Sequence, residues 1–170
     1  MKYTSAEAAK LIKSLNEQHS ALATELIKTK STFPAAMGED PETVRPEFNL
    51  TEALRTLDKL EERIRQVKHE LNIFNATTVI PEIEMTIDQV LIYIPQLSYR
   101  KDILGEMARR LPKERDMSPY LSSSPIVNYI YANYEIEDAK KELKEVSEKL
   151  TQVQLALDRV NSTVSFEIPD

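Results

Sequence analysis

The sequence contains no cysteine and no tryptophan, and only two of its 170 residues are glycine. Without cysteine the chain cannot form disulfides, thiol nucleophiles or thiolate metal sites. No glycine-rich phosphate loop, nucleophile elbow or metalloprotease motif is present. No apolar run approaches the roughly 20 residues of a membrane-spanning helix, and the N-terminal MKYTSAEAAKL lacks the apolar core of a signal peptide. We therefore expect a cytoplasmic protein that does not enter a membrane.

The net charge of −6 argues against binding to duplex nucleic acid, which relies on a broad basic surface. The charge is unevenly distributed, however. Residues 100–115 contain six basic and three acidic side chains, a local charge of +3, so the rest of the chain has −9. This basic segment is the most informative candidate for a binding site.

Hydrophobic residues at 41% and charged residues at 29% are typical of a helix-rich protein, and the length predicts one domain over residues 1–170. The first helix is expected from about Ser5 to Lys30. Residues 32–47 contain three prolines and a glycine, which predicts a loop. The second helix is expected to begin with Asn49 and Glu52 in capping-box spacing.

The third helix is expected to begin with a capping box of Thr86 and Gln89 and to run to about Arg110. Pro95 removes one backbone donor, so we expect a kink or break near Ile94. The fourth helix has the most regular heptads. Apolar residues occupy its a and d positions at Ile136, Ala139, Leu143, Val146, Leu150, Val153, Leu157 and Val160. Such a seam needs a long helical partner, within the chain or in another copy. We interpret it as core, with a partner-binding surface as the alternative.

The second and fourth helical repeats end in similar sequences, FNATTVIPEI from Phe74 and DRVNSTVSFEI from Asp158. We expect Asn75 and Asn161 to terminate these helices in a left-handed conformation. The predicted fold is mainly α: an antiparallel bundle, or coiled coil, of about four helices in which the second and fourth run parallel. A small β element, formed by residues 78–80, 126–131 and 163–168, is expected to cap one end.

The predicted ligand site combines the basic segment with nearby tyrosines. Arginine donates paired hydrogen bonds to phosphate, and tyrosine can stack on a base. A solvated basic face paired with acidic helices is the alternative. The basic candidates are Arg100, Lys101, Arg109, Arg110, Lys113 and Arg115, and the aromatic ones are Tyr99, Tyr129 and Tyr131. Asn75 and Thr77 are added because the helix ends would join the site if the basic segment folds back to them.

Evidence for catalysis or for a metal site is weak. The two histidines, His19 and His69, lie in different helical repeats, and neither has further ligands at helical spacing. The carboxylates are spaced for pairing with lysine on helices, as in Glu137 and Lys141. We predict no catalytic residue, no metal and no cofactor.

Four quoted segments, in order, resemble a known family. They are NIFNATTV at 72–79, TIDQVL at 86–91, ANYEIEDAKKEL at 132–143 and QLALDRVNSTVSFEI at 154–168. This order is similar to that of the septicolysin-like proteins, an uncharacterised family of helical proteins from bacteria and their phages. The resemblance spans about residues 50–168. It implies a helical fold and leaves the activity open.

Together these features predict a non-enzymatic, homo-oligomeric helical protein that binds a small phosphate-bearing ligand, such as a nucleotide. One version is a phage anti-defence sponge that sequesters a host nucleotide signal in the host cytoplasm. The alternative is a structural or assembly protein whose coiled-coil faces bind another helical protein.

Overall fold

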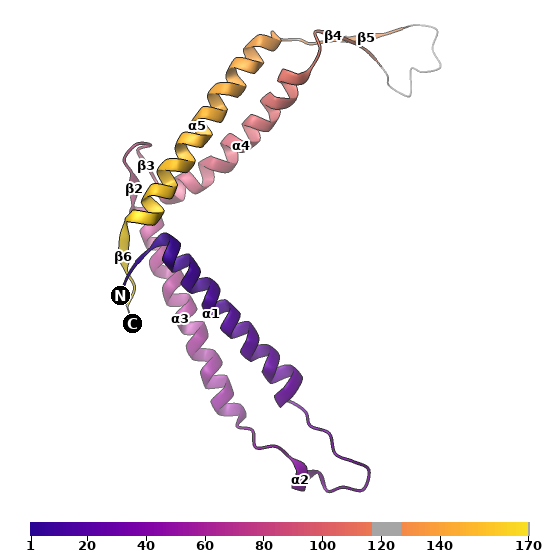
Figure 1. The fold of residues 1–170 in the computed structure, drawn as a ribbon, viewed down its shortest axis with the longest axis vertical. Helices are drawn as coiled ribbons and strands as arrows, with labels where there is room; N and C mark the ends of the chain where they lie inside the picture. The colour runs from indigo at the N-terminus through magenta and orange to yellow at the C-terminus, as the bar shows by residue number, and fades with distance from the viewer. Residues whose placement is uncertain (117–126, 170) are drawn as a thin grey trace. The chain divides into compact units, whose positions relative to one another are not determined.

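The computed structural model describes residues 1–116 and 127–169, and the chain separates into two compact units. Unit 1 comprises Met1–Thr77 together with the C-terminal segment from Val160, and unit 2 comprises Thr78–Arg159. Most of the described chain is helical, and the strands form small antiparallel pairs (Figure 1). The mainly α class predicted from the sequence is therefore confirmed.

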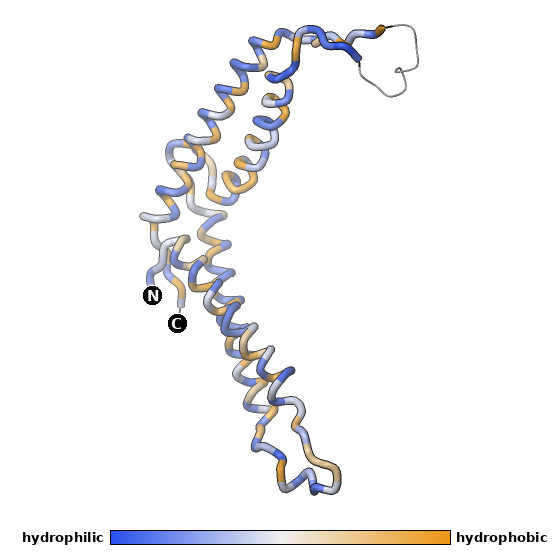
Figure 2. The backbone as a smooth tube through the Cα atoms, turned by 45° about the vertical axis from the view of Figure 1, so that its right-hand side comes forward, coloured by the Kyte–Doolittle hydropathy of each residue, from blue (hydrophilic) through white to orange (hydrophobic). Residues whose placement is uncertain are grey.

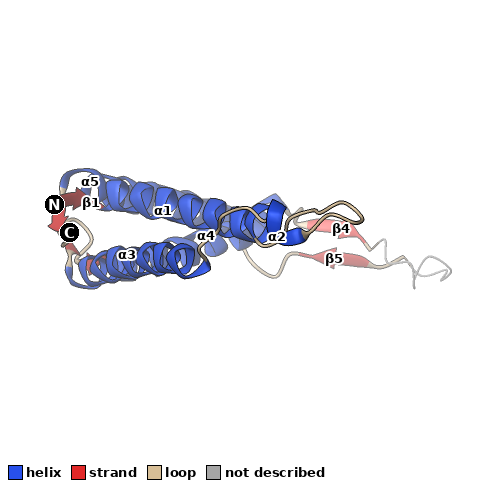
Figure 3. Cartoon of the chain, turned by 90° about the horizontal axis from the view of Figure 1, so that it is seen from below, coloured by secondary structure: helices blue, strands red, loops and turns tan. Residues whose placement is uncertain are grey.

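Unit 1 is built on two antiparallel helices that lie side by side (Figures 1 and 3). Helix α1, Ser5–Glu25, continues into a π-helical turn, Leu26–Lys30. A loop containing the short helix α2, Pro41–Val44, then leads to α3, Leu50–Thr77. The core between the helices is centred on the buried residues Ala8, Leu15, Val67 and Ile168. Around it pack the partly buried Tyr3, Leu11, Ile12, Leu60, Ile64, Leu71 and Phe166.

Side-chain caps fix where these helices begin. Thr4 and Glu7 form a complete capping box at the start of α1. Hydrogen bonds donated by the backbone N–H and then by the hydroxyl of Thr4 lower the pKa of Glu7. At the start of α3 the N–H of Glu52 donates to Asn49 Oδ1 over 3.1 Å, as the spacing predicts. These bonds satisfy N–H groups that have no partner within the helix.

The two ends of the chain meet in unit 1. Strand β1, Lys2–Thr4, pairs antiparallel with β6, Ser165–Glu167. The α-amino group of Met1 donates to the carbonyl of Ile168, whose N–H donates back to the carbonyl of Met1, both over 2.9 Å. Phe166 stacks on Phe74 of α3 with ring centroids 4.5 Å apart. The C-terminal segment is therefore an integral part of the core of unit 1.

Unit 2 begins with a hairpin of β2, Val79–Ile80, and β3, Met85–Thr86. Helix α4, Ile87–Arg109, starts with the predicted capping box. A second hairpin of β4, Lys113–Arg115, and β5, Tyr129–Tyr131, leads to the long helix α5, Ile136–Thr163, whose last turn belongs to unit 1. The tube in Figure 2 shows apolar and polar residues alternating along both helices.

The heptad seam of α5 is core, as we interpreted it. Its buried residues are Ala139, Val146, Leu150, Val153, Leu157 and Val160, and its members Ile136 and Leu143 are partly buried. On α4 the buried residues are Ile87, Val90 and Leu97. Burial of a long apolar seam is the main source of stability for helices of this kind.

The chain contains the same arrangement twice: a strand, a helix, a connection, a second helix and a strand. The first copy is β1, α1, α3 and β2, and the second is β3, α4, α5 and β6. In each copy the first helix starts with a threonine capping box, and the second helix ends in an Asn-x-Thr sequence. Each of the pairs β1–β6 and β2–β3 joins the first strand of one copy to the last strand of the other. The repeated helix endings in the sequence are part of this duplication.

The single small β element that we expected is wrong. The strands make three separate pairs, because each expected strand finds a partner absent from the prediction, at Lys2–Thr4, Met85–Thr86 or Lys113–Arg115. Residue 126 of the predicted strand 126–131 lies outside the described residues. Of the kink or break expected near Ile94, the break is wrong, because α4 runs as one helix through Pro95.

Asn75 and Asn161 do not terminate their helices. Each helix continues for two further residues, to Thr77 and Thr163, and Glu84 is the non-glycine residue of the described chain that has a positive φ. The hydroxyl of Thr77 donates to the carbonyl of Ile73, one turn back, over 2.8 Å. At the end of α5 the backbone N–H of Val164 donates to the carbonyl of Val160 over 3.0 Å, so helical hydrogen bonding extends past Asn161.

Candidate ligand-binding surface

Four of the predicted site residues lie on one face of the β4–β5 ribbon. The register places Lys113 opposite Tyr131 and Arg115 opposite Tyr129. Residues directly opposite each other, and residues two apart on one strand, share a face of a sheet. We call Lys113, Arg115, Tyr129 and Tyr131 the basic-aromatic face. Figure 3 shows the two strands side by side.

Within this face Lys113 lies over both aromatic rings. Its Nζ is 4.1 Å from the ring centroid of Tyr129 and 5.5 Å from that of Tyr131. Both distances are within the range of a cation–π interaction. The rings nevertheless remain open to solvent, at 49% and 61% exposure respectively. The exposed Arg115 has no ion-pair partner in residues 1–116 and 127–169.

The opposite face of the ribbon contains Glu114 and the exposed Ile130, which are also directly paired. Glu114 accepts an ion pair from Arg110, with Nη1 and Oε1 3.7 Å apart. This contact ties the ribbon to the end of α4. The arginine is thereby engaged away from the basic-aromatic face.

A cavity of about 570 Å³ lies where α4, the ribbon and α5 meet. Pro112 and Ala132, which are joined by a hydrogen bond at the base of the ribbon, form part of its wall. The remaining lining residues are Ala108, Arg109, Arg110, Leu111, Tyr134, Glu135, Ile136, Glu137 and Lys140. The volume is in the range of small-molecule sites.

The cations of this cavity are paired with carboxylates. Arg109 lies 2.8 Å from Glu106, and Lys140 lies 2.7 Å from Glu137. The hydroxyl of Tyr134 donates to the carbonyl of Met107 over 2.8 Å, which fixes the start of α5 against the end of α4. An anion entering the cavity would therefore compete with existing ion pairs.

The remaining predicted residues of unit 2 lie elsewhere on α4. Tyr99 is 70% exposed, and Arg100 is exposed. Lys101 borders a second cavity, of about 460 Å³, together with Asp102, Arg109 and others. Thus the structure groups the predicted basic residues into the ribbon face, the end of α4 and the middle of α4.

Asn75 and Thr77 belong to unit 1, whereas the other nine predicted residues belong to unit 2. The hydroxyl of Thr77 is occupied by the helix backbone. The side-chain oxygens of Asn75 and Asn161 are buried and accept no hydrogen bond. The sequence analysis missed Lys140 and Glu135, which approach the cavity only through the turn from β5 into α5. No local motif could have identified them.

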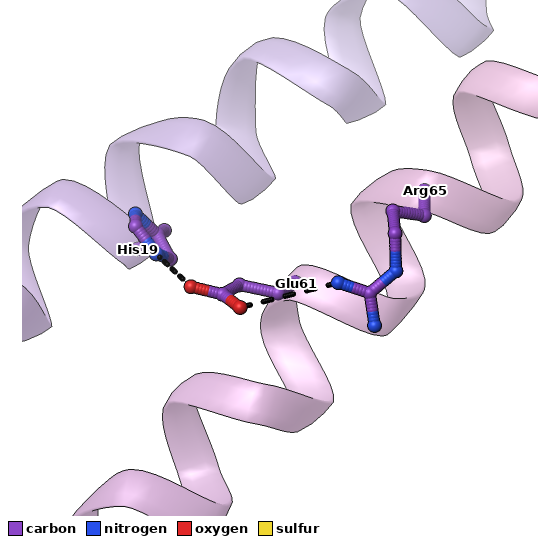
Figure 4. A network of polar contacts seen from close by, with 3 residues as sticks. All are labelled: His19, Glu61 and Arg65. Atoms are coloured by element: carbon purple, nitrogen blue, oxygen red, sulfur yellow. Dashed lines mark hydrogen bonds and ion pairs between the residues drawn. The ribbon is translucent and has the colours of Figure 1, made fainter.

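His19 is partly buried and lies at the edge of the core of unit 1. Its Nε2 is 3.0 Å from Glu61 of α3, and Glu61 is 3.9 Å from Arg65 (Figure 4). Within the described residues no three or more His, Asp or Glu side chains are grouped to hold a metal ion. No described helix is long and apolar enough to cross a membrane.

Comparisons with known proteins show the fold and no activity. No protein-family model matches the chain, and no curated protein is significantly similar to it. The crystal structure of a functionally unknown conserved protein from Corynebacterium diphtheriae is similar over 98% of this chain and 100% of that chain, with a TM-score of 0.61 and 18% identity. At this identity the similarity concerns the fold alone. The septicolysin-like resemblance stays a prediction.

Proposed function

We propose that this protein binds a small ligand containing both an aromatic ring and a phosphate, such as a nucleotide, on the basic-aromatic face. The observation behind the proposal is the placement of Lys113 and Arg115 beside the open rings of Tyr129 and Tyr131 on one side of a two-stranded ribbon. Phenol rings stack on bases and cations attract phosphates, and both are binding interactions. The proposed role is therefore to hold or sequester the ligand without chemical change.

The two halves of such a ligand match the two kinds of side chain. Stacking of one base on an aromatic ring is worth about 1–3 kcal/mol. The guanidinium of Arg115 can donate two parallel hydrogen bonds to phosphate. The ammonium of Lys113 is already held between the rings, so its charge is positioned before the ligand arrives. The nearby cavity offers room for the part of the ligand that lies beyond the ribbon.

Salt should weaken this binding strongly. The cations of the face, Lys113 and Arg115, are exposed, and exposed charges are screened at physiological ionic strength. Isothermal titration with a panel of nucleotides, at low and at physiological salt, tests the proposal. Heat for at least one member at low salt is expected, and no heat for any member would refute it.

Variants of the face make the titration specific. Tyr131→Ala should weaken binding about tenfold or more, because it removes a stacking surface. The matched Tyr131→Phe keeps the ring and should bind like the wild type. Lys144→Gln changes an exposed lysine of α5 outside the face and serves as the charge control for Arg115→Gln. If Lys144→Gln and Arg115→Gln lower the affinity equally, the attraction is unspecific, and the assignment of the ligand to the basic-aromatic face is wrong.

The second candidate, an assembly protein, has different support. The α5 heptads are buried within the chain, so they are not available to a partner. Changing Leu150 to Asp would therefore disturb folding before it tested a contact. A partner would have to use an apolar face that the chain leaves exposed, and α4 has one.

We also retain, as a proposal, the packing of the four long helices into a single antiparallel bundle.

A further inference from the structure

The two rings of the basic-aromatic face are separate stacking surfaces on one strand. Tyr129 and Tyr131 are two residues apart on β5, so both lie on the same side and their backbone positions are about 7 Å apart. Both rings are open to solvent. Each exposed ring can take one base, because base and ring stack face to face. A ligand with a single base therefore leaves one ring uncovered.

The cations of the face lie in a row beside the rings. The ammonium Nζ of Lys113 is within 5.5 Å of both ring centroids, so a phosphate bound to it is adjacent to both rings. The register adds a second cation, because Arg115 lies opposite Tyr129 on the same face. The ribbon thus has two rings on β5 next to two cations on β4. A nucleotide chain has the same layout, with bases on one side and phosphates on the other.

From these two rows we infer that the basic-aromatic face binds a two-base ligand, in which two nucleosides are joined by one phosphodiester. One base stacks on each tyrosine, and the phosphate between them lies beside Lys113. Arg115 is placed for a terminal phosphate. Aromatic side chains on sheets of RNA-binding domains stack two or three bases in this manner. The inference rests on the proposed function and specifies its ligand class.

A two-base unit occurs both as a free dinucleotide and within single-stranded nucleic acid, and the charges near the ribbon favour the free form. A long strand needs a positively charged groove that continues beyond the face. Arg109 and Arg110, at the end of α4 next to the ribbon, are already paired with carboxylates. The chain as a whole has a net charge of −6. We therefore expect a short ligand.

Titration with two matched probes tests the inference. The first is a dinucleoside monophosphate with two adenines, and the second is the same molecule with one base replaced by hydrogen. Both have the same charge, so a difference in affinity measures the second base. The wild type should bind the two-base probe at least about tenfold more tightly. Equal affinity for the two probes would overturn the inference, whereas no binding of either probe or of any mononucleotide would overturn the proposed function itself.

Variants of β5 locate the second base. Tyr129→Ala and Tyr131→Ala should each remove the preference for the two-base probe, because each leaves one ring. Tyr131→Phe keeps both rings and should keep the preference. Ile130→Ala is the matched control, since Ile130 is exposed on the opposite face and its truncation tests the ribbon without changing the rings. Loss of the preference in Ile130→Ala, or its persistence in either alanine variant of the tyrosines, contradicts the inference.

Two further ligands test where the two-base unit ends. A terminal phosphate added to the two-base probe should raise its affinity for the wild type and not for Arg115→Gln. A gain that persists in Arg115→Gln would refute the placement of that phosphate. A single strand of about eight nucleotides should bind no more tightly per dinucleotide step than the two-base probe. Tighter binding of the strand would assign the two-base unit to single-stranded nucleic acid and refute the expected short ligand.

Discussion

Replacing Ile168 with alanine tests how far the C-terminal segment stabilises unit 1. Ile168 is fully buried and belongs to the same core cluster as Ala8, Leu15 and Val67. The change removes three carbon atoms, worth about 2.4 kcal/mol at about 0.8 kcal/mol each. A residual cavity adds to this loss, and substitutions of this kind cost about 2–5 kcal/mol. We expect a loss of about 3 kcal/mol in the free energy of unfolding of unit 1.

Urea unfolding followed by circular dichroism measures this loss. Two units can give two transitions, so the curves are fitted with one transition for each unit. With a typical dependence of about 1–3 kcal/mol per molar urea, the midpoint of unit 1 should fall by about 1–3 M. The midpoint of unit 2 should change little, because the contacts of Ile168 in this core cluster lie in unit 1.

Val164→Ala is the matched control, because Val164 lies four residues away and is 39% exposed. Its substitution should cost well under half as much, since much of the side chain already contacts water. If the two variants differ by less than about 0.5 kcal/mol, the C-terminal segment does not contribute to the core as the structure indicates.

Three smaller perturbations follow from polar contacts. Thr4→Ala removes the cap of α1 and should lower the stability of unit 1 by about 1 kcal/mol. Because the pKa of Glu7 is lowered in the folded protein, its contribution is present above its ordinary value of 4.5 and is lost as the pH falls through the folded value. Urea midpoints measured from neutral to acidic pH should therefore converge for wild type and Thr4→Ala. His19→Ala should cost less than about 1 kcal/mol, because its partner Glu61 is 42% exposed, and a larger loss in urea unfolding would contradict that reading. Tyr134→Phe removes one hydrogen bond and should destabilise unit 2 by about 1 kcal/mol, whereas an unchanged unit 2 midpoint would show that the bond is not formed in solution.

The sequence predicted the features that depend on local pattern. The Thr86–Gln89 capping box, the Asn49 cap of α3 and the α5 seam were correct because capping side chains act over three residues and heptads repeat over the length of one helix. Strand pairing was not predictable in the same way. The segment Lys113–Arg115 has no β pattern, and it forms a strand because the chain returns beside it at Tyr129–Tyr131.

In the candidate site, too, local pattern was predictable and strand pairing was not. The tyrosines and cations were found by their density in the sequence, but their grouping depended on the register of β4 and β5. Side chains alternate along β4, so Glu114 lies on the other face from Lys113 and Arg115. The register places Tyr129 and Tyr131 opposite these two cations, on the same face.

The pairing of Met1 with Ile168 has a consequence for how the protein is made. These partners are 167 residues apart in the chain, whereas unit 2 is continuous from Thr78 to Arg159. During synthesis on the ribosome, α1 and α3 emerge before unit 2, yet the segment that completes their core, residues 165–168, emerges after it. Unit 2 has all its residues before then. Unit 1 should therefore finish folding second, with Val67 and Phe74 incompletely covered until residues 165–168 have emerged.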